Sequence, residues 1–160
     1  MGLDMYLEAR RFVSGYNHSS PDEQKTFEGI LDAVGMTGMT DSPHITVNVN
    51  VAYWRKANHI HDWFVKHVQD GEDDCKSYYV PREKLVELED ACRKVVEAGT
   101  AEVASELLPT SAGFFFGGTE YDEYYFEQTD WTAKRLAEIL TTVPAGSGLS
   151  TYDFYYQSSW

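Results

Sequence analysis

The pattern that most constrains the fold is a strict alternation of side chains between residues 45 and 53. Every second residue in this run is Ile, Val or Tyr, and the residues between them are Thr, Asn or Ala. Successive side chains of a β-strand point to opposite faces of a sheet, so this period predicts a half-buried strand. The same period recurs at residues 3–12 and 151–160, which predicts two further strands.

Helical spacing occupies much of the chain between these strands. Apolar residues three and four positions apart, with Pro near the start and Gly after the end of several stretches, predict helices. The expected helices cover residues 21–34, 55–69, 81–98, 101–107 and 129–142, and shorter strand-like runs occur at 78–80 and 114–116. We therefore predict a single domain over residues 1–160 with an α+β fold. It would have one mixed or mainly antiparallel sheet of about four to five strands, with about four to five helices packed on it.

The balance of charge excludes one large class of ligands. The chain has 13 basic and 26 acidic residues, for a formal net charge of −13. Affinity for nucleic acid comes mainly from Lys and Arg that displace counterions from phosphates, so this surface opposes binding to DNA or RNA. A second interpretation stays open, in which carboxylates at residues 70–74 and 120–130 imitate nucleic acid and inhibit a basic protein that handles DNA or RNA.

The cysteines and the hydropathy pattern bear on the cellular compartment. Cys92 falls on the apolar face of a predicted helix and Cys75 in a polar stretch, and both are interpreted as free thiols. No apolar run approaches the roughly 20 residues that a membrane-spanning helix requires. These features predict a cytoplasmic protein that does not engage a membrane.

The densest group of polar and aromatic residues lies where the strand at residues 45–53 is followed by a helix. The backbone N–H groups at the start of a helix favour an anion, so Arg55 and Lys56 at this junction could hold a phosphate or a carboxylate. The other candidate binding residues of the segment are Trp54, the hydrogen-bonding Asn58 and His59, and Trp63, which would stack or pack.

Two histidines of this segment, His59 and His61, raise the question of metal binding. Two positions along a helix are about 200° apart around its axis, so these rings point to roughly opposite faces and cannot easily share one metal. No metal and no cofactor are therefore expected. His61 falls on the apolar stripe of the helix, where a core histidine satisfied by a hydrogen bond is typical.

A second candidate segment lies between residues 113 and 125. Its candidate binding or catalytic residues are Gly117, Gly118, Tyr121, Asp122 and Glu123. The two glycines let the backbone approach a ligand closely, and the two acidic residues could accept hydrogen bonds or act as acid and base. The aromatic residues here and near Trp160 suit a recognition surface, because Tyr and Trp supply rigid contact area.

Several blocks of sequence carry a resemblance to a known family. They are MGLDMYL at residues 1–7, AYWRKAN at 52–58, IH at 60–61, WF at 63–64, LLPT at 107–110, GFFFG at 113–117, YDE at 121–123 and YQSSW at 156–160. These blocks span nearly the whole chain, and together they resemble a family of small proteins encoded in bacteriophage and prophage genomes. The resemblance implies a phage accessory protein in the cytoplasm of the infected cell, and it implies no particular activity.

The leading hypothesis is a phage-encoded binding protein. It would engage either a host protein or a small anionic ligand through the two candidate segments, and it could counter host defence by inhibiting a host factor. Arg55 and Lys56 would hold the negative charge, and Tyr121 or Trp160 would pack against the partner.

The competing hypothesis is a small hydrolase or transferase. In this mechanism His59 or His61 would act as general base, Asp122 or Glu123 would be its partner, and Arg55 would stabilise the developing charge. Geometry separates the two hypotheses, because catalysis requires an imidazole within hydrogen-bond reach of a carboxylate inside a concave pocket.

Overall fold

A computed structural model of the chain describes residues 2–39, 44–146 and 151–160. Within these residues the strands form one four-stranded sheet in the order β2-β1-β4-β3, and every pairing is antiparallel. The strands are β1 (Asp4–Ser14), β2 (His44–Arg55), β3 (Tyr78–Val80) and β4 (Asp153–Ser159). The predicted α+β fold with a single, mainly antiparallel sheet is confirmed.

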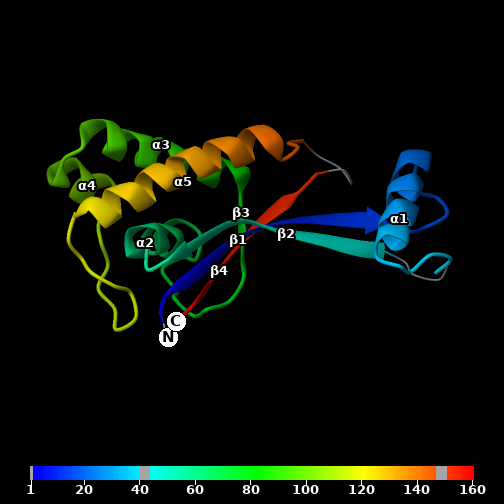
Figure 1. The fold of residues 1–160 in the computed structure, drawn as a ribbon, viewed down its shortest axis with the longest axis horizontal. Coiled ribbons are helices and arrows are strands. Elements are labelled where there is room, and N and C mark those ends of the chain that lie inside the picture. Colours follow the sequence, from blue (N-terminus) through cyan, green and yellow to red (C-terminus); the bar gives the residue numbers. More distant parts are fainter. Residues whose placement is uncertain (1, 40–43, 147–150) are drawn as a thin grey trace.

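The helices of the described residues confirm most of the predicted helical segments. They are α1 (Pro21–Ala33), α2 (Asn58–His67), α3 (Arg82–Ala98), α4 (Ala101–Leu107) and α5 (Glu123–Thr142). In Figure 1, α2, α3 and α5 lie over one face of the sheet, and α1 stands apart at the far end of β1 and β2. The functional candidates at residues 53–64 and 113–125 therefore lie at the same end of the molecule as the main group of helices.

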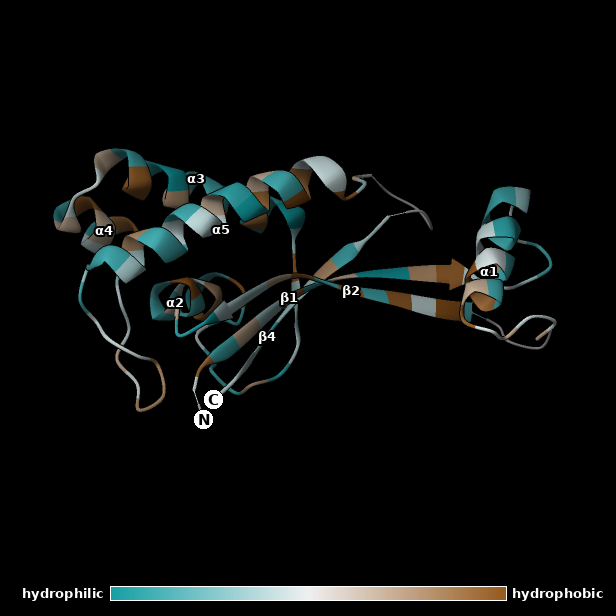
Figure 2. Ribbon diagram, viewed as in Figure 1, coloured by the Kyte–Doolittle hydropathy of each residue, from teal (hydrophilic) through white to brown (hydrophobic). Residues whose placement is uncertain are grey.

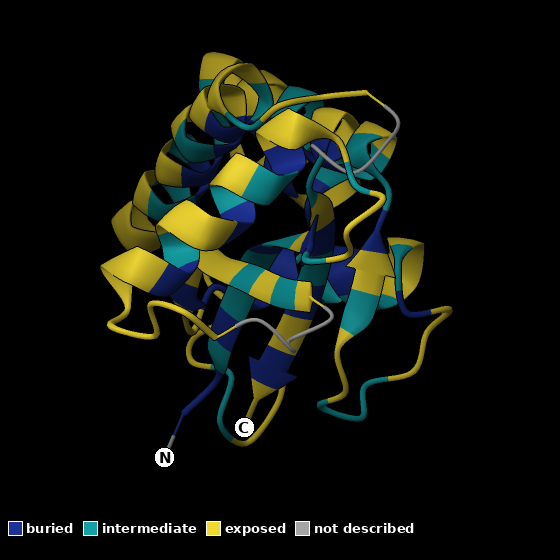
Figure 3. Ribbon diagram, turned by 90° about the vertical axis from the view of Figure 1, so that its right-hand side faces the viewer, coloured by how far each residue is buried: buried dark blue, intermediate teal, exposed yellow. Residues whose placement is uncertain are grey.

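The alternation along β1 decides which face of the sheet the helices cover. Met5, Leu7 and Ala9 are buried, whereas the residues between them remain partly exposed. Across the interface, Phe64 of α2 stacks on Tyr156 of β4 with ring centroids 4.0 Å apart. Figure 3 shows the buried residues gathered where the helices face the sheet, and the yellow exposed residues on the outer sides of the helices.

The parts of β1 and β2 that extend beyond β4 form an arm with α1 packed near its end (Figure 1). We define the arm as residues 11–39 and 44–47, since β4 pairs with β1 only as far as residue 10 and residue 11 pairs with residue 47 of β2. Its apolar residues form a cluster of their own, with Val13, Phe27 and Leu31 buried at the centre. Figure 2 shows this hydrophobic end of the strands beneath α1. The molecule therefore has a large core under the main helices and a small second core in the arm.

Helix α5 begins earlier than the apolar spacing predicts. The pattern predicts a start near residue 129, whereas the helix starts at Glu123 and Asp122 is its N-cap. The Asp122 carboxylate accepts a hydrogen bond from the backbone N–H of Tyr125 at 3.0 Å. A side-chain acceptor at the N-cap satisfies a backbone donor that the helix itself leaves unpaired, which stabilises this start.

The run of three phenylalanines at residues 114–116 is a turn, and the prediction of a strand there is wrong. The backbone N–H of Phe116 donates to the carbonyl of Gly113 at 3.1 Å, which closes the turn. Gly117 then has a φ of +90°, a value that glycine adopts without strain. The turn is held to the residue before β1 by a backbone hydrogen bond from Leu3 N to Phe115 O at 3.1 Å.

Candidate functional site

The junction between β2 and α2 has an unusual backbone conformation. Lys56, which follows the last residue of β2, has a φ of +59°, in the left-handed region that side chains other than glycine rarely adopt. Its backbone N–H donates to the carbonyl of Leu3 at 2.8 Å, so the tight turn is held against the start of β1. Strained residues of this kind concentrate at functional sites, which directs attention to the turn.

The first turn of α2 has no side-chain cap. Ala57 occupies the N-cap position and no acidic residue lies in the first turn. The first backbone N–H groups of a helix have no partner within the helix, and they carry the positive end of its dipole. The start of α2, next to Arg55 and Lys56, therefore has no side-chain acceptor at its N-cap and no first-turn acid to offset its dipole.

Asn58, the first residue of α2, fixes the second candidate segment against the first. Its side-chain nitrogen donates to the carbonyls of Phe116 at 3.1 Å and Gly118 at 2.7 Å, and its side-chain oxygen accepts from the backbone N–H of Ser111 at 3.1 Å. Because both amide hydrogens are used in this way, Asn58 positions the segment at residues 111–118. The sequence predicts a direct ligand contact for this side chain, and the structure gives it an internal role.

A small cavity lies where these two segments meet, and we call it the junction pocket. It has a volume of about 210 Å³. The residues that line it are Lys56, Asn58, His59, Thr110, Gly117, Gly118, Glu120, Asp122, Tyr124 and Tyr125. Six of the residues predicted to bind a ligand thus come together, although the two segments lie far apart in the sequence: Lys56, Asn58, His59, Gly117, Gly118 and Asp122. Gly117 lies close to Lys56, because a Cβ added at Gly117 would be 3.2 Å from the Cβ of Lys56.

The charged groups around the junction pocket differ in whether they already have partners. Most basic side chains of the described residues form ion pairs with nearby carboxylates, whereas Arg55 and Lys56 are exposed and form none there. Both side chains approach Gly2, where an added Cβ would lie 3.4 Å from Lys56 Cε and 3.9 Å from Arg55 Nε. Two acidic residues also line the pocket: Asp122, which caps α5, and the exposed Glu120.

His59 is a buried, neutral side chain at the floor of the junction pocket. Its Nε2 lies 3.1 Å from Thr129 Oγ1, and that hydroxyl donates to the Tyr125 carbonyl at 2.7 Å. The threonine oxygen is therefore the acceptor, so Nε2 carries the proton of the imidazole. Burial lowers the pKa of His59 to about 3, because the charged form loses its water. At neutral pH this ring can orient a ligand by a hydrogen bond, and it is a poor general base.

His61 has both ring nitrogens engaged inside the protein. Nδ1 lies 2.7 Å from the Tyr156 hydroxyl, and Nε2 lies 3.0 Å from an oxygen of Asp73. The carboxylate beside His61 is thus Asp73, and neither Asp122 nor Glu123 takes that place. The sequence offers no periodic link between His61 and Asp73, since the intervening loop has no regular pattern. Only the acidic run that contains Asp73 marked it as a region of interest.

The remaining predicted site residues lie in two environments. Trp54 is 1% exposed and donates its indole N–H to Thr132 in the core at 2.8 Å, so it supports the site from below. Trp63 is also buried. The Tyr121 hydroxyl accepts from the backbone N–H of Thr110 at 3.5 Å, beside the junction pocket. Glu123 lies exposed in the first turn of α5.

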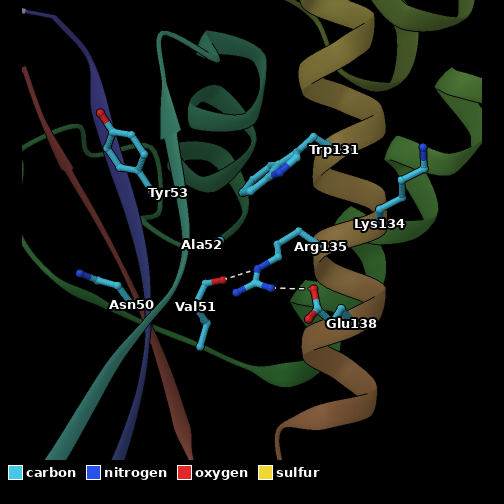
Figure 4. A pocket seen from close by; sticks show the side chains of 8 residues that line it. All are labelled: Asn50, Val51, Ala52, Tyr53, Trp131, Lys134, Arg135 and Glu138. Carbon is cyan, nitrogen blue, oxygen red and sulfur yellow. Dashed lines mark hydrogen bonds and ion pairs between the residues drawn. The ribbon is translucent and has the colours of Figure 1, made fainter.

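A second hollow lies along the free edge of β2 (Figure 4) and has a volume of about 440 Å³. Here β2 has a bulge, because Leu7 pairs with Ala52 and Glu8 with Asn50, and Val51 is left over. Arg135 of α5 donates from Nε to the Val51 carbonyl at 2.6 Å and from Nη1 to a Glu138 oxygen at 2.6 Å. The neighbouring Lys134 pairs with Asp130. Lys134 and Arg135, the cations that line this hollow, already have partners. The hollow is therefore a weaker candidate for binding an anion than the junction pocket.

Metal and thiol chemistry find little support in the described residues. No group of three or more His, Cys, Asp or Glu side chains there could hold a metal ion. Cys92 is buried, and burial raises the pKa of its thiol, which opposes formation of the reactive thiolate. Cys75 is a free, partly buried thiol.

Comparisons with known proteins leave the geometry as the main guide to function. No protein family, no curated protein and no solved structure matches this chain. In the described part of the chain, no helix combines the length and apolar character that crossing a bilayer requires.

Proposed function

We propose that this chain is a binding protein that holds a small anionic ligand in the junction pocket. The observation that carries the proposal is the pair of exposed, unpaired cations, Arg55 and Lys56, beside the uncapped start of α2. The positive end of the helix dipole repels cations at a helix start, so Arg55 and Lys56 lie in an electrostatically unfavourable position. A bound anion would offset this repulsion.

The lining of the pocket indicates how a ligand would be held. Lys56 and the first N–H groups of α2 would bind the anionic group, as helix starts commonly do for phosphate and carboxylate. The unprotonated Nδ1 of the neutral His59 could accept one hydrogen bond without adding charge. Glu120 and Asp122 would face the other end of the ligand, so they favour a molecule that also carries hydrogen-bond donors. The volume of about 210 Å³ restricts the bound part to a small molecule or to one end of a larger one.

The geometry gives the enzyme hypothesis less support. The imidazole with a carboxylate partner, His61, is 1% exposed and both of its nitrogens are occupied. The other imidazole, His59, lines the pocket and has a low pKa, and its side-chain partner is the Thr129 hydroxyl. A general base needs a free nitrogen within reach of the substrate and a pKa near the working pH, and neither ring combines these properties.

Several of the carboxylates suspected of imitating nucleic acid are used within the protein, which interrupts both acidic runs. Asp73 bonds to His61 and Trp160, and Asp74 pairs with Lys76. Asp122 caps α5. A nucleic-acid mimic needs rows of free carboxylates, so these internal contacts favour the binding hypothesis over mimicry.

The resemblance to phage proteins implies that the protein would bind its ligand inside an infected cell. In the cytoplasm of an infected cell, the ligand would be a small anionic host molecule, or a phosphate or carboxylate group presented by a host protein. Capture of either could inhibit a host defence factor. A binding protein needs no metal and no cofactor for this role.

Titration of the ¹⁵N-labelled protein with inorganic phosphate tests the proposal by NMR. We expect saturable shifts of the backbone amides of Asn58, His59, Gly117 and Gly118, and a weaker response elsewhere. A hydrogen bond to a charged group contributes about 1.5–3 kcal/mol, so Lys56→Ala should weaken phosphate binding roughly ten-fold or more.

The matched control is Lys25→Ala, which removes the same charge from an exposed position on α1. The control should bind phosphate like the wild type. Shifts scattered over the whole surface, or an equal loss of binding in Lys25→Ala and Lys56→Ala, would show that phosphate is attracted only by general charge and would reject the junction pocket.

A further inference from the structure

A third pocket lies on the other side of the segment at residues 111–118, and we call it the aromatic pocket. It has a volume of about 440 Å³ and is mostly apolar, with Phe114, Phe116 and Trp160 among its lining residues. Phe114 is 95% exposed, which is exceptional for a phenylalanine, and Trp160 is also exposed. Phe116 packs in part against the main core, but neither that core nor the proposed anion site accounts for the exposure of Phe114 and Trp160.

The rings of this pocket lie at steep angles to one another. Phe116 and Trp160 have centroids 6.2 Å apart with planes 69° apart, and His61 meets Phe116 at 5.0 Å and 85°. Phe114 and Phe115 are also nearly perpendicular, at 4.9 Å and 86°. The face of an aromatic ring carries partial negative charge, and four phenylalanine and tryptophan rings line this one pocket.

A carboxylate is held in fixed orientation at the same pocket. Asp73 accepts from His61 Nε2 at 3.0 Å through one oxygen and from the Trp160 indole N–H at 3.0 Å through the other. Burial raises the pKa of Tyr156 well above its ordinary value, so its hydroxyl keeps its proton and can donate it to His61 Nδ1. With the Tyr156 hydroxyl as donor to Nδ1, an uncharged His61 donates from Nε2 to Asp73, so both ring nitrogens have partners.

The remaining charges of the aromatic pocket are also negative. Asp62 contributes a second carboxylate, which pairs with Lys66 at 2.6 Å. Among the described residues that line the pocket there is no Lys and no Arg. The space thus combines aromatic lining residues with carboxylates that internal contacts already hold in position, which lowers the free-energy cost of ordering them on binding.

We propose that the aromatic pocket binds a small organic cation with an ammonium head group. Aromatic faces attract such a cation through their quadrupole, and Asp73 adds direct Coulomb attraction from a partly desolvated position. An anion would meet the Asp73 carboxylate, and Lys66 beside the pocket is already paired with Asp62, so the preference is opposite to that of the junction pocket. This site does not depend on the anion site and stands whether or not phosphate binds there.

The test compares two ligands of nearly the same shape and different charge. Choline carries a trimethylammonium group, and 3,3-dimethylbutan-1-ol replaces that group with a neutral tert-butyl group. Both are titrated into the full-length ¹⁵N-labelled protein, with the indole N–H of Trp160 and the amide of Phe116 as reporters. We expect saturable shifts with choline and at least roughly ten-fold weaker binding of the neutral alcohol, given the usual strength of desolvated cation–π and charge interactions.

Two variants locate the effect. Asp73→Asn keeps the size of the side chain and removes its charge, and should weaken choline binding roughly ten-fold. Asp70→Asn removes the same charge from an exposed neighbour that does not line the pocket, and should leave binding unchanged. Trp160→Leu keeps Asp73 and removes one ring, and should also weaken choline binding.

Three outcomes would overturn the proposal. Equal affinity for choline and the neutral alcohol would show a simple apolar cavity, and equal effects of Asp73→Asn and Asp70→Asn would show only general attraction by an acidic protein. Absence of saturation in a wild type that unfolds cooperatively would show that no site exists. If Asp73→Asn fails to fold, the Trp160→Leu variant and the comparison of the two ligands still decide the question.

Discussion

Two histidines only two positions apart on one helix have different chemical roles, because different side chains contact each imidazole ring. His59 faces the Thr129 hydroxyl and is neutral, with a pKa lowered to about 3 by burial. His61 lies between a phenol and a carboxylate. The spacing indicated that the two rings point to different faces of the helix. It contained no information on which side chains each ring would contact.

The buried His59 predicts a dependence of stability on pH. The unfolded chain binds a proton at this residue near its ordinary pKa of 6.5, whereas the folded protein does so only near 3. As the pH falls from about 6.5 to 3, the unfolded state gains a proton that the folded state excludes, so the free energy of unfolding falls by about 1.4 kcal/mol per pKa unit of difference.

Chemical denaturation across this pH range checks the prediction. The His59→Gln variant should lose less stability than the wild type as the pH falls, although it is less stable at pH 7. The exposed His18→Gln variant serves as the control and should follow the wild type. Parallel curves for wild type and His59→Gln would mean that His59 is protonated in the folded state.

At the scale of single elements, each helix and strand follows from local signals that differ in clarity. The strands β1, β2 and β4 were predictable because their alternation matches one buried and one exposed face of a sheet. The start of α5 was missed because Tyr124, Tyr125 and Phe126 interrupt the apolar spacing of a helix. Asp122 followed by Glu123 was a usable N-cap signal there, since a capping acid and a first-turn acid often begin a helix.

The cap of α5 predicts a measurable loss of stability. Asp122→Ala removes the hydrogen bond to the Tyr125 N–H, and N-cap substitutions of this kind cost about 0.5–2 kcal/mol. Urea denaturation followed by circular dichroism should show a lower midpoint with an unchanged slope.

Glu120→Ala provides the comparison, because it removes an exposed acid just outside the helix. Its midpoint should stay close to that of the wild type. If both variants lose the same stability, the contribution of Asp122 is general electrostatics and the cap has no separate effect.

The turn at residues 114–116 shows why a local pattern can fail. Three consecutive phenylalanines favour a strand, yet glycines at residues 113 and 117 and the tether from Asn58 make a turn of lower free energy. The sequence did indicate that this segment and the β2–α2 junction matter. It could not indicate that they meet, because that contact depends on how α5 packs back over α2.

At the scale of the whole molecule, the chain consists of two cores of unequal size joined by one long β-ribbon. The main core lies under α2, α3 and α5, and the arm has only the small cluster around Val13, Phe27 and Leu31. Both candidate pockets lie at the main core. Elements that bury little apolar surface open at lower free energy, so we expect the arm to open without the rest of the protein.

Hydrogen exchange tests this independence. Leu31→Ala removes part of the small cluster, and substitutions of buried leucine by alanine cost about 2–5 kcal/mol. Amides of residues 11–14 and 44–47 should exchange faster in this variant, whereas those of Leu7 and Trp54 should keep their rates. Leu88→Ala in the main core should speed exchange throughout. Faster exchange everywhere in Leu31→Ala would show one cooperative unit.

The contact between Arg135 and the Val51 carbonyl also bears on how molecules of this protein behave at high concentration. An exposed strand edge can act as a template for a strand from another molecule, which leads to ribbons and then to insoluble aggregates. Along β2 an incoming strand would meet a bulge and a carbonyl already bound by a guanidinium. At the opposite edge of the sheet it would find β3, which has only three residues. The architecture thus protects solubility at both edges of the sheet, independently of any ligand.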